Sequence, residues 1–214
     1  SGNIICIASG IPERQQGGIT LKNANNVKRI AGIALLMALI VVMQMLGGMI
    51  PPVGGFTISL VLIPIVLGAA IYGPGAGALL GATFGVIVFI GCINGTDVGG
   101  AMVLQANPVL CFLVVMSKGT LAGFAAGFVY RLMKDKNPYL AMVCAAIVCP
   151  VVNTGVFILC MLAFFIDVLA VWAGGGEVLG YILTGLILAN FVPELIINVV
   201  FSPAGQRILK AVNR

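Results

Sequence analysis

The feature that most constrains this chain is its series of long apolar runs, which contain almost no charged residues. Six such segments can be recognised, and most approach the roughly 20 residues that a helix needs to cross a bilayer. Charged residues make up 8% of the chain, against about 25% in soluble domains. We therefore predict an all-α integral membrane protein with six transmembrane helices, at about residues 27–47, 56–72, 75–93, 108–132, 138–165 and 178–201.

The basic residues predict the orientation of these helices. Ten of the eleven Lys and Arg residues lie before or at the start of the first segment, after the sixth, or at the end of the fourth and in the connection to the fifth. With six spans, all three places are on one side of the membrane, and the connections on the other side carry only acidic charges, namely Asp97, Asp167 and Glu177. Cytoplasmic loops are enriched in Lys and Arg, so both termini are predicted to be cytoplasmic.

The polar stretch 1–26 differs from the rest of the chain. It lacks a basic segment followed by an apolar core and a cleavage site, so it does not match a secretory signal. We predict a flexible cytoplasmic tail over residues 1–26 and a transmembrane substrate-binding domain over residues 27–214. The basic residues lie at the ends of apolar runs, which favours contact with the bilayer and gives no reason to expect nucleic acid as a partner.

Catalytic and metal chemistry find little support in the residue types. The chain contains no His, and its six Cys residues form no CxxC pair, so neither a metal site nor a cofactor is expected. Buried Cys behaves as a small hydrophobe. No GxxxxGK[ST] phosphate loop is present. We predict that the protein is not an enzyme, and that any ATP hydrolysis that drives transport takes place on another chain.

Three polar residues inside the apolar segments fall at similar depths. Lys118, Asn153 and Glu194 each lie 13–15 residues from the inner end of their segment, which is roughly 20 Å along a helix. Asn190 lies four residues before Glu194, on the same helix face. A charged side chain at this depth costs about 2.5–3.5 kcal/mol or more, so these groups are expected to face the bundle interior.

Two interpretations of these buried charges remain open. Lys118 and Glu194 form an ion pair that ties two helices together, or one or both contact a polar solute. A buried ion pair stabilises a fold poorly compared with apolar packing, which favours the solute. The outward connections add further candidate substrate-binding residues, namely Asp97, Gln105, Asn107 and Trp172. Trp172 has a second interpretation, as an anchor at the membrane interface.

Small residues recur at four-residue spacing on several segments. The third segment contains Gly77, Gly81 and Gly85, and the fourth contains the GxxxGxxxG run 119–127. Glycines on one face allow two helices to approach closely. They indicate tight packing within this bundle or, alternatively, a face for another subunit. The first segment carries the weaker pattern Ala34-x-x-x-Ala38.

Several of these stretches together resemble the substrate-binding S component of energy-coupling factor (ECF) vitamin transporters. The likeness covers about residues 27–210. It is carried by Ala34-x-x-x-Ala38, by Ile58 to Ala69 followed by Tyr72-Gly-Pro-Gly-Ala-Gly, by the run from Lys118 to Arg131, and by Asn190-x-x-Pro-Glu194. The glycine-proline turn and the fourth-segment pattern are the more specific parts of this resemblance.

The resemblance implies a six-helix membrane protein of the prokaryotic plasma membrane that captures a micronutrient from outside. Ala34 and Ala38 would dock a transmembrane coupling subunit, which works with two ATPase subunits. The first outer loop, 47–55, would act as a gate. Lys118 suggests a ligand with a carboxylate, and the amides suggest hydroxyl contacts, so pantothenate ranks first, followed by riboflavin and folate.

Two other functions remain open at this stage. A stand-alone secondary carrier would use Lys118 and Glu194 as a proton relay, although the two halves of the chain share no clear repeat. A structural membrane protein would use the same two residues as a tie and would bind no ligand.

Overall fold

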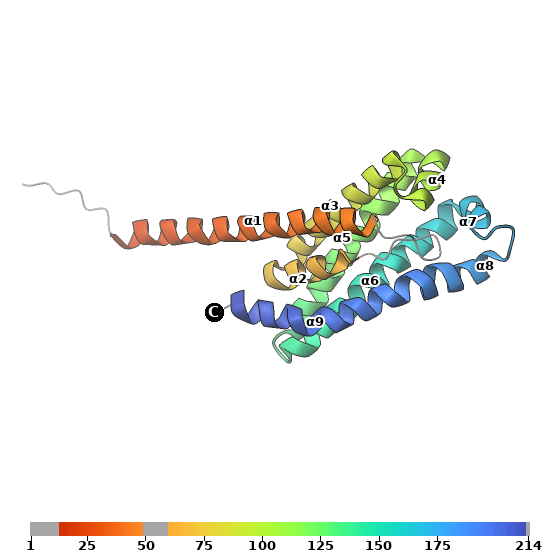
Figure 1. The fold of residues 1–214 in the computed structure, drawn as a ribbon. Coiled ribbons are helices and arrows are strands. Elements are labelled where there is room, and N and C mark those ends of the chain that lie inside the picture. Colours follow the sequence, from red (N-terminus) through yellow and green to blue (C-terminus); the bar gives the residue numbers. More distant parts are fainter. Residues whose placement is uncertain (1–12, 49–59, 213–214) are drawn as a thin grey trace, which may run out of the picture.

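The computed structural model describes residues 13–48 and 60–212, with side chains for residues 26–47 and 60–211. These residues are almost entirely helical and contain no strand (Figure 1). The helices in chain order are α1 (Glu13–Gly48), α2 (Leu62–Tyr72), α3 (Pro74–Asn94), α4 (Val98–Ala106), α5 (Pro108–Met133), α6 (Pro138–Phe164), α7 (Ile166–Trp172), α8 (Val178–Tyr181), the π-helix η1 (Ile182–Phe191) and α9 (Val192–Val212).

Five helical stretches are long and apolar enough to cross a membrane. They are Asn26–Gly47, Pro74–Asn94, Pro108–Met133, Pro138–Phe164 and Val178–Ala211. The protein is therefore an all-helical, multi-pass membrane protein. The helix α2 has 11 residues, which is about 16 Å of helix and short of the ~30 Å hydrocarbon core. Part of the second predicted segment, residues 56–59, lies outside the described residues, so the predicted sixth span stays a prediction.

The flexible tail predicted for residues 1–26 also stays a prediction. Helix α1 begins at Glu13, within that stretch, and residues 1–12 lie outside the described residues. The loop 49–55, for which the resemblance implies a gate, lies outside them as well.

Proline fixes the starts of three long helices. Pro74, Pro108 and Pro138 each occupy the first turn of a helix, where the missing N–H is not needed. Asn107 and Asn137 precede two of them, and each side chain accepts hydrogen bonds from two backbone N–H groups of the following turn. The two Asn-Pro pairs therefore set where α5 and α6 begin.

Glycine faces bring α3 and α5 into backbone contact. A Cβ atom added at Gly81 would overlap the carbonyl oxygen of Gly119, and one added at Gly77 would overlap that of Gly123. The two GxxxGxxxG faces pack directly against each other, so the interpretation as tight packing inside the bundle is confirmed. This pair of helices forms the centre of the molecule (Figure 1).

Helix α1 lies at the edge of the bundle and projects beyond it (Figure 1). Leu36 and Ile40 are buried, and Arg29 donates a hydrogen bond to the carbonyl oxygen of Tyr72 at the end of α2 (3.1 Å). The opposite face is open, because Ala34 and Ala38 are both exposed. The pattern Ala34-x-x-x-Ala38 therefore lies on a helix face that the described residues leave uncovered.

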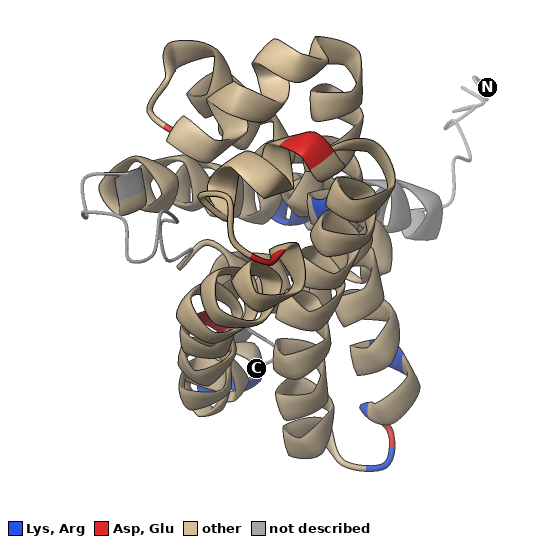
Figure 2. Ribbon diagram, turned by 90° about the vertical axis from the view of Figure 1, so that its right-hand side faces the viewer, with Lys and Arg blue, Asp and Glu red and all other residues tan. Residues whose placement is uncertain are grey.

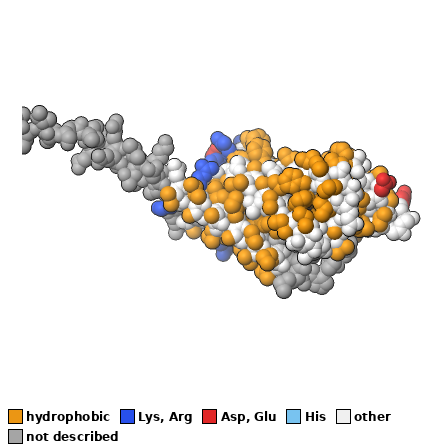
Figure 3. Space-filling model, turned by 90° about the horizontal axis from the view of Figure 1, so that it is seen from above, with side chains coloured by type: hydrophobic (Ala, Val, Ile, Leu, Met, Phe, Trp, Pro, Cys, Tyr) orange, Lys and Arg blue, Asp and Glu red, His pale blue; other side chains and the backbone are white. Residues whose placement is uncertain are grey.

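Charges gather at the two ends of the bundle. Lys and Arg lie mostly at the end that contains the C-terminus and the turn between α5 and α6 (Figure 2). Acidic side chains mark the opposite end when the molecule is seen from above (Figure 3). The exposed long sides between the ends are largely apolar, as expected for a surface in contact with lipid.

Two connections that the sequence suggests are loops contain helices. The chain between α3 and α5 forms α4, whose first turn is capped by the Asp97 side chain, which accepts a hydrogen bond from Gly100 N (2.9 Å). The chain after α6 forms α7, which ends at Trp172. Both helices are short and lie at the end of the bundle that carries the acidic residues.

Candidate functional site

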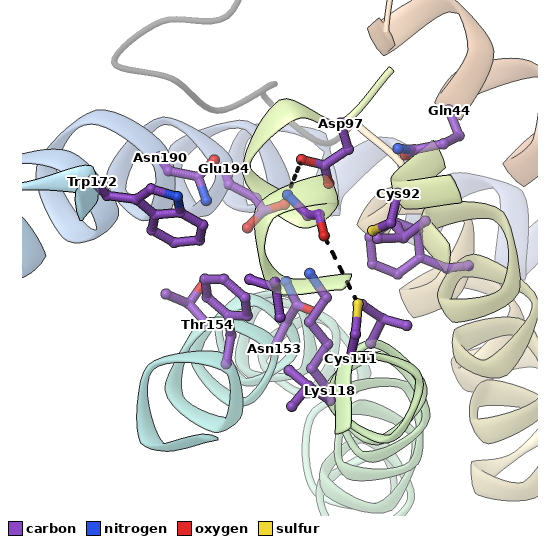
Figure 4. Close-up of a pocket in the computed structure, with 17 residues that line it drawn as sticks. Gln44, Cys92, Asp97, Cys111, Lys118, Asn153, Thr154, Trp172, Asn190 and Glu194 are labelled. Carbon is purple, nitrogen blue, oxygen red and sulfur yellow. Dashed lines mark hydrogen bonds between the residues drawn. The ribbon is translucent and has the colours of Figure 1, made fainter. Parts of the chain in front are cut away.

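A cavity lies between α3, α4, α5, α6 and α9, toward the end capped by α4 and α7 (Figure 4). The volume of the cavity is about 90 Å³, which is room for several waters or a small solute. Side chains from α1, α7 and η1 complete the wall. The cavity brings together residues that lie up to 150 positions apart, from Gln44 to Glu194.

Lys118 extends from α5 into this cavity. Its Nζ atom lies 4.8 Å from the centroid of the Phe157 ring and 5.8 Å from that of Phe84, which are cation–π distances. Within the described part of the chain, no hydrogen bond or ion pair reaches the ammonium group. The aromatic rings partly stabilise the charge and leave its hydrogen-bond donors available.

Two buried oxygen atoms in the cavity wall lack donors. Glu194 is 2% exposed and Asn153 is 7% exposed, and both line the cavity. Among the described residues, neither Glu194 Oε2 nor Asn153 Oδ1 accepts a hydrogen bond. Buried polar atoms normally have partners, so these two acceptors call for a donor that the described residues do not supply.

The helix that carries Glu194 changes its geometry just before this residue. The stretch Ile182–Phe191 is a π-helix, and α9 follows at Val192. Pro193 cannot donate a backbone hydrogen bond, and its ring would clash with the carbonyl one α-helical turn earlier, so a wider turn before it relieves the conflict. Asn190 and Glu194 both line the cavity.

Asn198, which lies four residues after Glu194, behaves differently from Asn190 and Glu194. Asn198 is buried outside the cavity, and its Nδ2 atom donates to the backbone oxygen of Glu194 (2.9 Å). This side chain is satisfied within its own helix.

An aromatic group forms the wall near α7. Trp172 stacks on Phe157, with ring centroids 6.5 Å apart, and lies 6.4 Å from the Tyr181 ring centroid. Its Nε1 atom donates to Met102 Sδ on α4 (3.2 Å). Trp172 therefore links α7 to α4 and α6 beside the cavity. Its two interpretations, as a substrate-binding residue and as an anchor at the membrane interface, both stay predictions.

Six of the eight predicted substrate-binding residues lie around this one cavity, namely Lys118, Asn153, Asn190, Glu194, Asp97 and Trp172. The other two lie elsewhere. Gln105 is exposed near the end of α4, and Asn107 uses its side-chain oxygen to cap α5, accepting from Val109 N and Leu110 N at 3.1 Å each. Asn107 is thus engaged by the backbone.

The cavity also contains residues that the sequence reasoning did not select. Cys111, Val114 and Val115 lie seven, four and three residues before Lys118, so helical spacing from Lys118 would have found them. Phe84, Val88 and Cys92, which are four residues apart on one face of α3, also line the cavity. Gln44 on α1 had no such signal.

The arrangement is suited to binding. An ammonium group, a carboxylate and an amide face one small cavity with aromatic and aliphatic walls, which is typical of a small-molecule site. Lys118 and Glu194 are not joined by an ion pair within the described residues, so the proposed tie between their helices is absent there.

Comparison with known families agrees with this picture. The family described as ECF transporter, substrate-specific component, matches residues 28–204, which is most of the chain. A comparison with curated proteins finds no match. The family consists of substrate-binding components of transporters and is not a family of enzymes. The chain therefore belongs to the family of substrate-specific components of ECF transporters.

Proposed function

We propose that this S component captures a small, water-soluble vitamin in the cavity between α5, α6 and α9, with pantothenate as its substrate. The observation that carries the proposal is a set of groups without hydrogen-bond or ion-pair partners among the described residues: the Lys118 ammonium, Glu194 Oε2 and Asn153 Oδ1. Burial of these groups without partners costs free energy, which a ligand with matching groups recovers.

The chemistry of pantothenate complements this set. Its carboxylate pairs with the Lys118 ammonium, and its hydroxyl and amide hydrogens reach Glu194 and Asn153. The small size of the cavity supports a ligand without fused rings and ranks riboflavin and folate second. The Phe157 and Phe84 rings give Lys118 partly apolar surroundings, which strengthens a charge-assisted hydrogen bond.

We further propose six spans with both termini in the cytoplasm of a prokaryotic cell. The concentration of Lys and Arg at one end of the bundle supports this orientation, which places the cavity toward the exterior. The exposed face of α1 with Ala34 and Ala38 docks the coupling subunit, and two ATPase subunits supply the energy.

A ligand pair tests the substrate assignment. Pantothenol differs from pantothenate in carrying an alcohol in place of the carboxylate. Calorimetric titration of the purified protein is expected to show a Kd for pantothenol about 10–150-fold higher, because a hydrogen bond to a charged group contributes about 1.5–3 kcal/mol. Lys118→Met should raise the Kd for pantothenate to a similar level and leave that for pantothenol nearly unchanged.

The control variant is Lys134→Met, in the exposed turn after α5, which should bind both ligands like the wild type. Wild-type protein that binds riboflavin or folate but not pantothenate would overturn the choice of vitamin. Equal affinity of Lys118→Met and wild type for pantothenate would overturn the role of Lys118.

A further inference from the structure

The antiparallel packing of α3 and α5 follows a regular register toward the cavity. A Cβ atom added at Gly85 would lie 2.7 Å from the carbonyl oxygen of Val115, continuing the glycine contacts described above. One turn further along α3, Phe89 meets Phe112 edge to face, with ring centroids 5.1 Å apart. Each turn forward on α3 thus corresponds to a turn back on α5.

Close to this aromatic contact, Cys92 follows Phe89 by three residues on α3, and Cys111 precedes Phe112 by one residue on α5. The two thiols lie against the same residue of α4, Gly100. The Cys111 Sγ atom lies 4.0 Å from the Gly100 carbonyl oxygen, and a Cβ atom on Gly100 would overlap Cys92 Sγ. Figure 4 shows both thiols on the same wall of the cavity.

These two thiols differ from the other cysteines of the described chain in their access. Cys92 and Cys111 are 2% and 1% exposed, but both line the cavity, which admits molecules the size of water. Hydrogen peroxide, with two heavy atoms, is small enough to follow. The remaining described cysteines, Cys144, Cys149 and Cys160, lie on α6 and do not line the cavity.

We infer that Cys92 and Cys111 form a reactive dithiol, which closes to a disulfide when a peroxide enters the cavity. One thiolate attacks a peroxide oxygen, the O–O bond breaks, and a sulfenic acid and a hydroxide form. The second thiolate then attacks the sulfenic sulfur, forming the S–S bond and releasing another hydroxide. Two protons from the original thiols convert both hydroxides to water, so two thiols and one peroxide give one disulfide and two waters.

The disulfide would clamp one wall of the cavity. It closes a short segment, residues 93–110, that contains all of α4 together with Asp97, Gly100 and Val103 of the cavity wall. Both thiols already lie against Gly100, so the bond joins two side chains that share one neighbour. Oxidation would therefore hold α4 in place over the cavity and restrict its local opening.

The test uses the purified full-length chain and hydrogen peroxide, and needs no knowledge of the substrate. After oxidation and blocking of free thiols, peptide mapping is expected to find Cys92 linked to Cys111. Amide hydrogen exchange across residues 98–106 should slow at least about threefold, and Tm should rise by about 5 °C. A reductant should reverse all three changes.

Cys111→Ser should abolish the exchange and Tm responses, whereas Cys144→Ser should retain them. The mapping uses the wild-type chain, so it stands even where a serine variant folds poorly. Linkage through Cys144, Cys149 or Cys160, sulfinic acid at Cys92 or Cys111, or free thiols at both after oxidation would each overturn the dithiol. A Cys92–Cys111 bond with unchanged exchange in α4 would overturn the clamp.

Discussion

Replacing Glu194 by methionine separates the binding role of this residue from a structural one. Methionine matches glutamate in length and has no side-chain oxygen. Glu194→Met therefore removes Oε2, which has no partner among the described residues, and keeps the packing volume close to its original value. A buried polar atom without a partner costs about 1–3 kcal/mol. We therefore expect the variant to be more stable than the wild type when no ligand is bound.

The size of the effect follows from the burial of Glu194. Its side chain is 2% exposed, so most of that cost applies, and the free energy of unfolding should rise by about 1–3 kcal/mol. At about 2–4 °C per kcal/mol for a chain of this length, Tm should rise by about 2–12 °C. Loss of a charge-assisted hydrogen bond should at the same time raise the Kd for pantothenate about 10–150-fold.

Thermal unfolding of the detergent-solubilised protein measures the first effect, and calorimetric titration measures the second. Asn198→Leu serves as the matched control, because Asn198 is equally buried on the same helix but has a hydrogen-bond partner, the backbone oxygen of Glu194. That control should lower Tm. If Glu194 instead ties helices through an ion pair, Glu194→Met should cost about 3–5 kcal/mol. A clear fall in Tm would therefore refute the binding role.

Two further predictions concern the helix faces. Gly81→Ala forces a Cβ atom against the backbone carbonyl of Gly119, so it should lower the free energy of unfolding by about 1–3 kcal/mol in thermal melts. Gly75→Ala, at an exposed position with open space around it, should leave Tm unchanged or slightly raised, and equal effects of the two variants would contradict close packing of α3 on α5. Ala38→Trp should bind vitamin normally and lose co-purification with the coupling subunit, whereas Ala163→Trp, on the exposed face of α6, should retain it. Normal co-purification of Ala38→Trp would remove the docking role of this face.

The long helices could be predicted from the sequence because prolines and apolar length determine them. Segments predicted at residues 108–132 and 138–165 correspond to α5, Pro108–Met133, and α6, Pro138–Phe164. The short helices α4 and α7 were not predicted, because seven to nine residues at the end of a bundle give no clear periodicity. Their stability depends on a cap at Asp97 and on packing that only the folded bundle supplies.

The candidate site could also be predicted in part from the sequence. Charges in hydrocarbon are rare enough to stand out, and the helical rise places Lys118, Asn153 and Glu194 at one depth. Sequence alone could not show that Phe84 and Phe157 lie at cation–π distance from the Lys118 ammonium, because rotation of α5 within the bundle decides this. Gln105 and Asn107 lie outside the cavity because α4 turns one outward and the α5 cap engages the other.

The π-helix Ile182–Phe191 has a consequence for how proteins of this kind can diverge. A π-turn contains about one residue more than an α-turn, so deletion of one residue there would return the stretch to α-helix and shift the side chains within it, while the flanking helices kept their orientation. Asn190 would then leave the cavity while Glu194 kept its place. Deletion of one residue, with no replacement of any cavity side chain, is thus a route by which such a protein changes its ligand specificity.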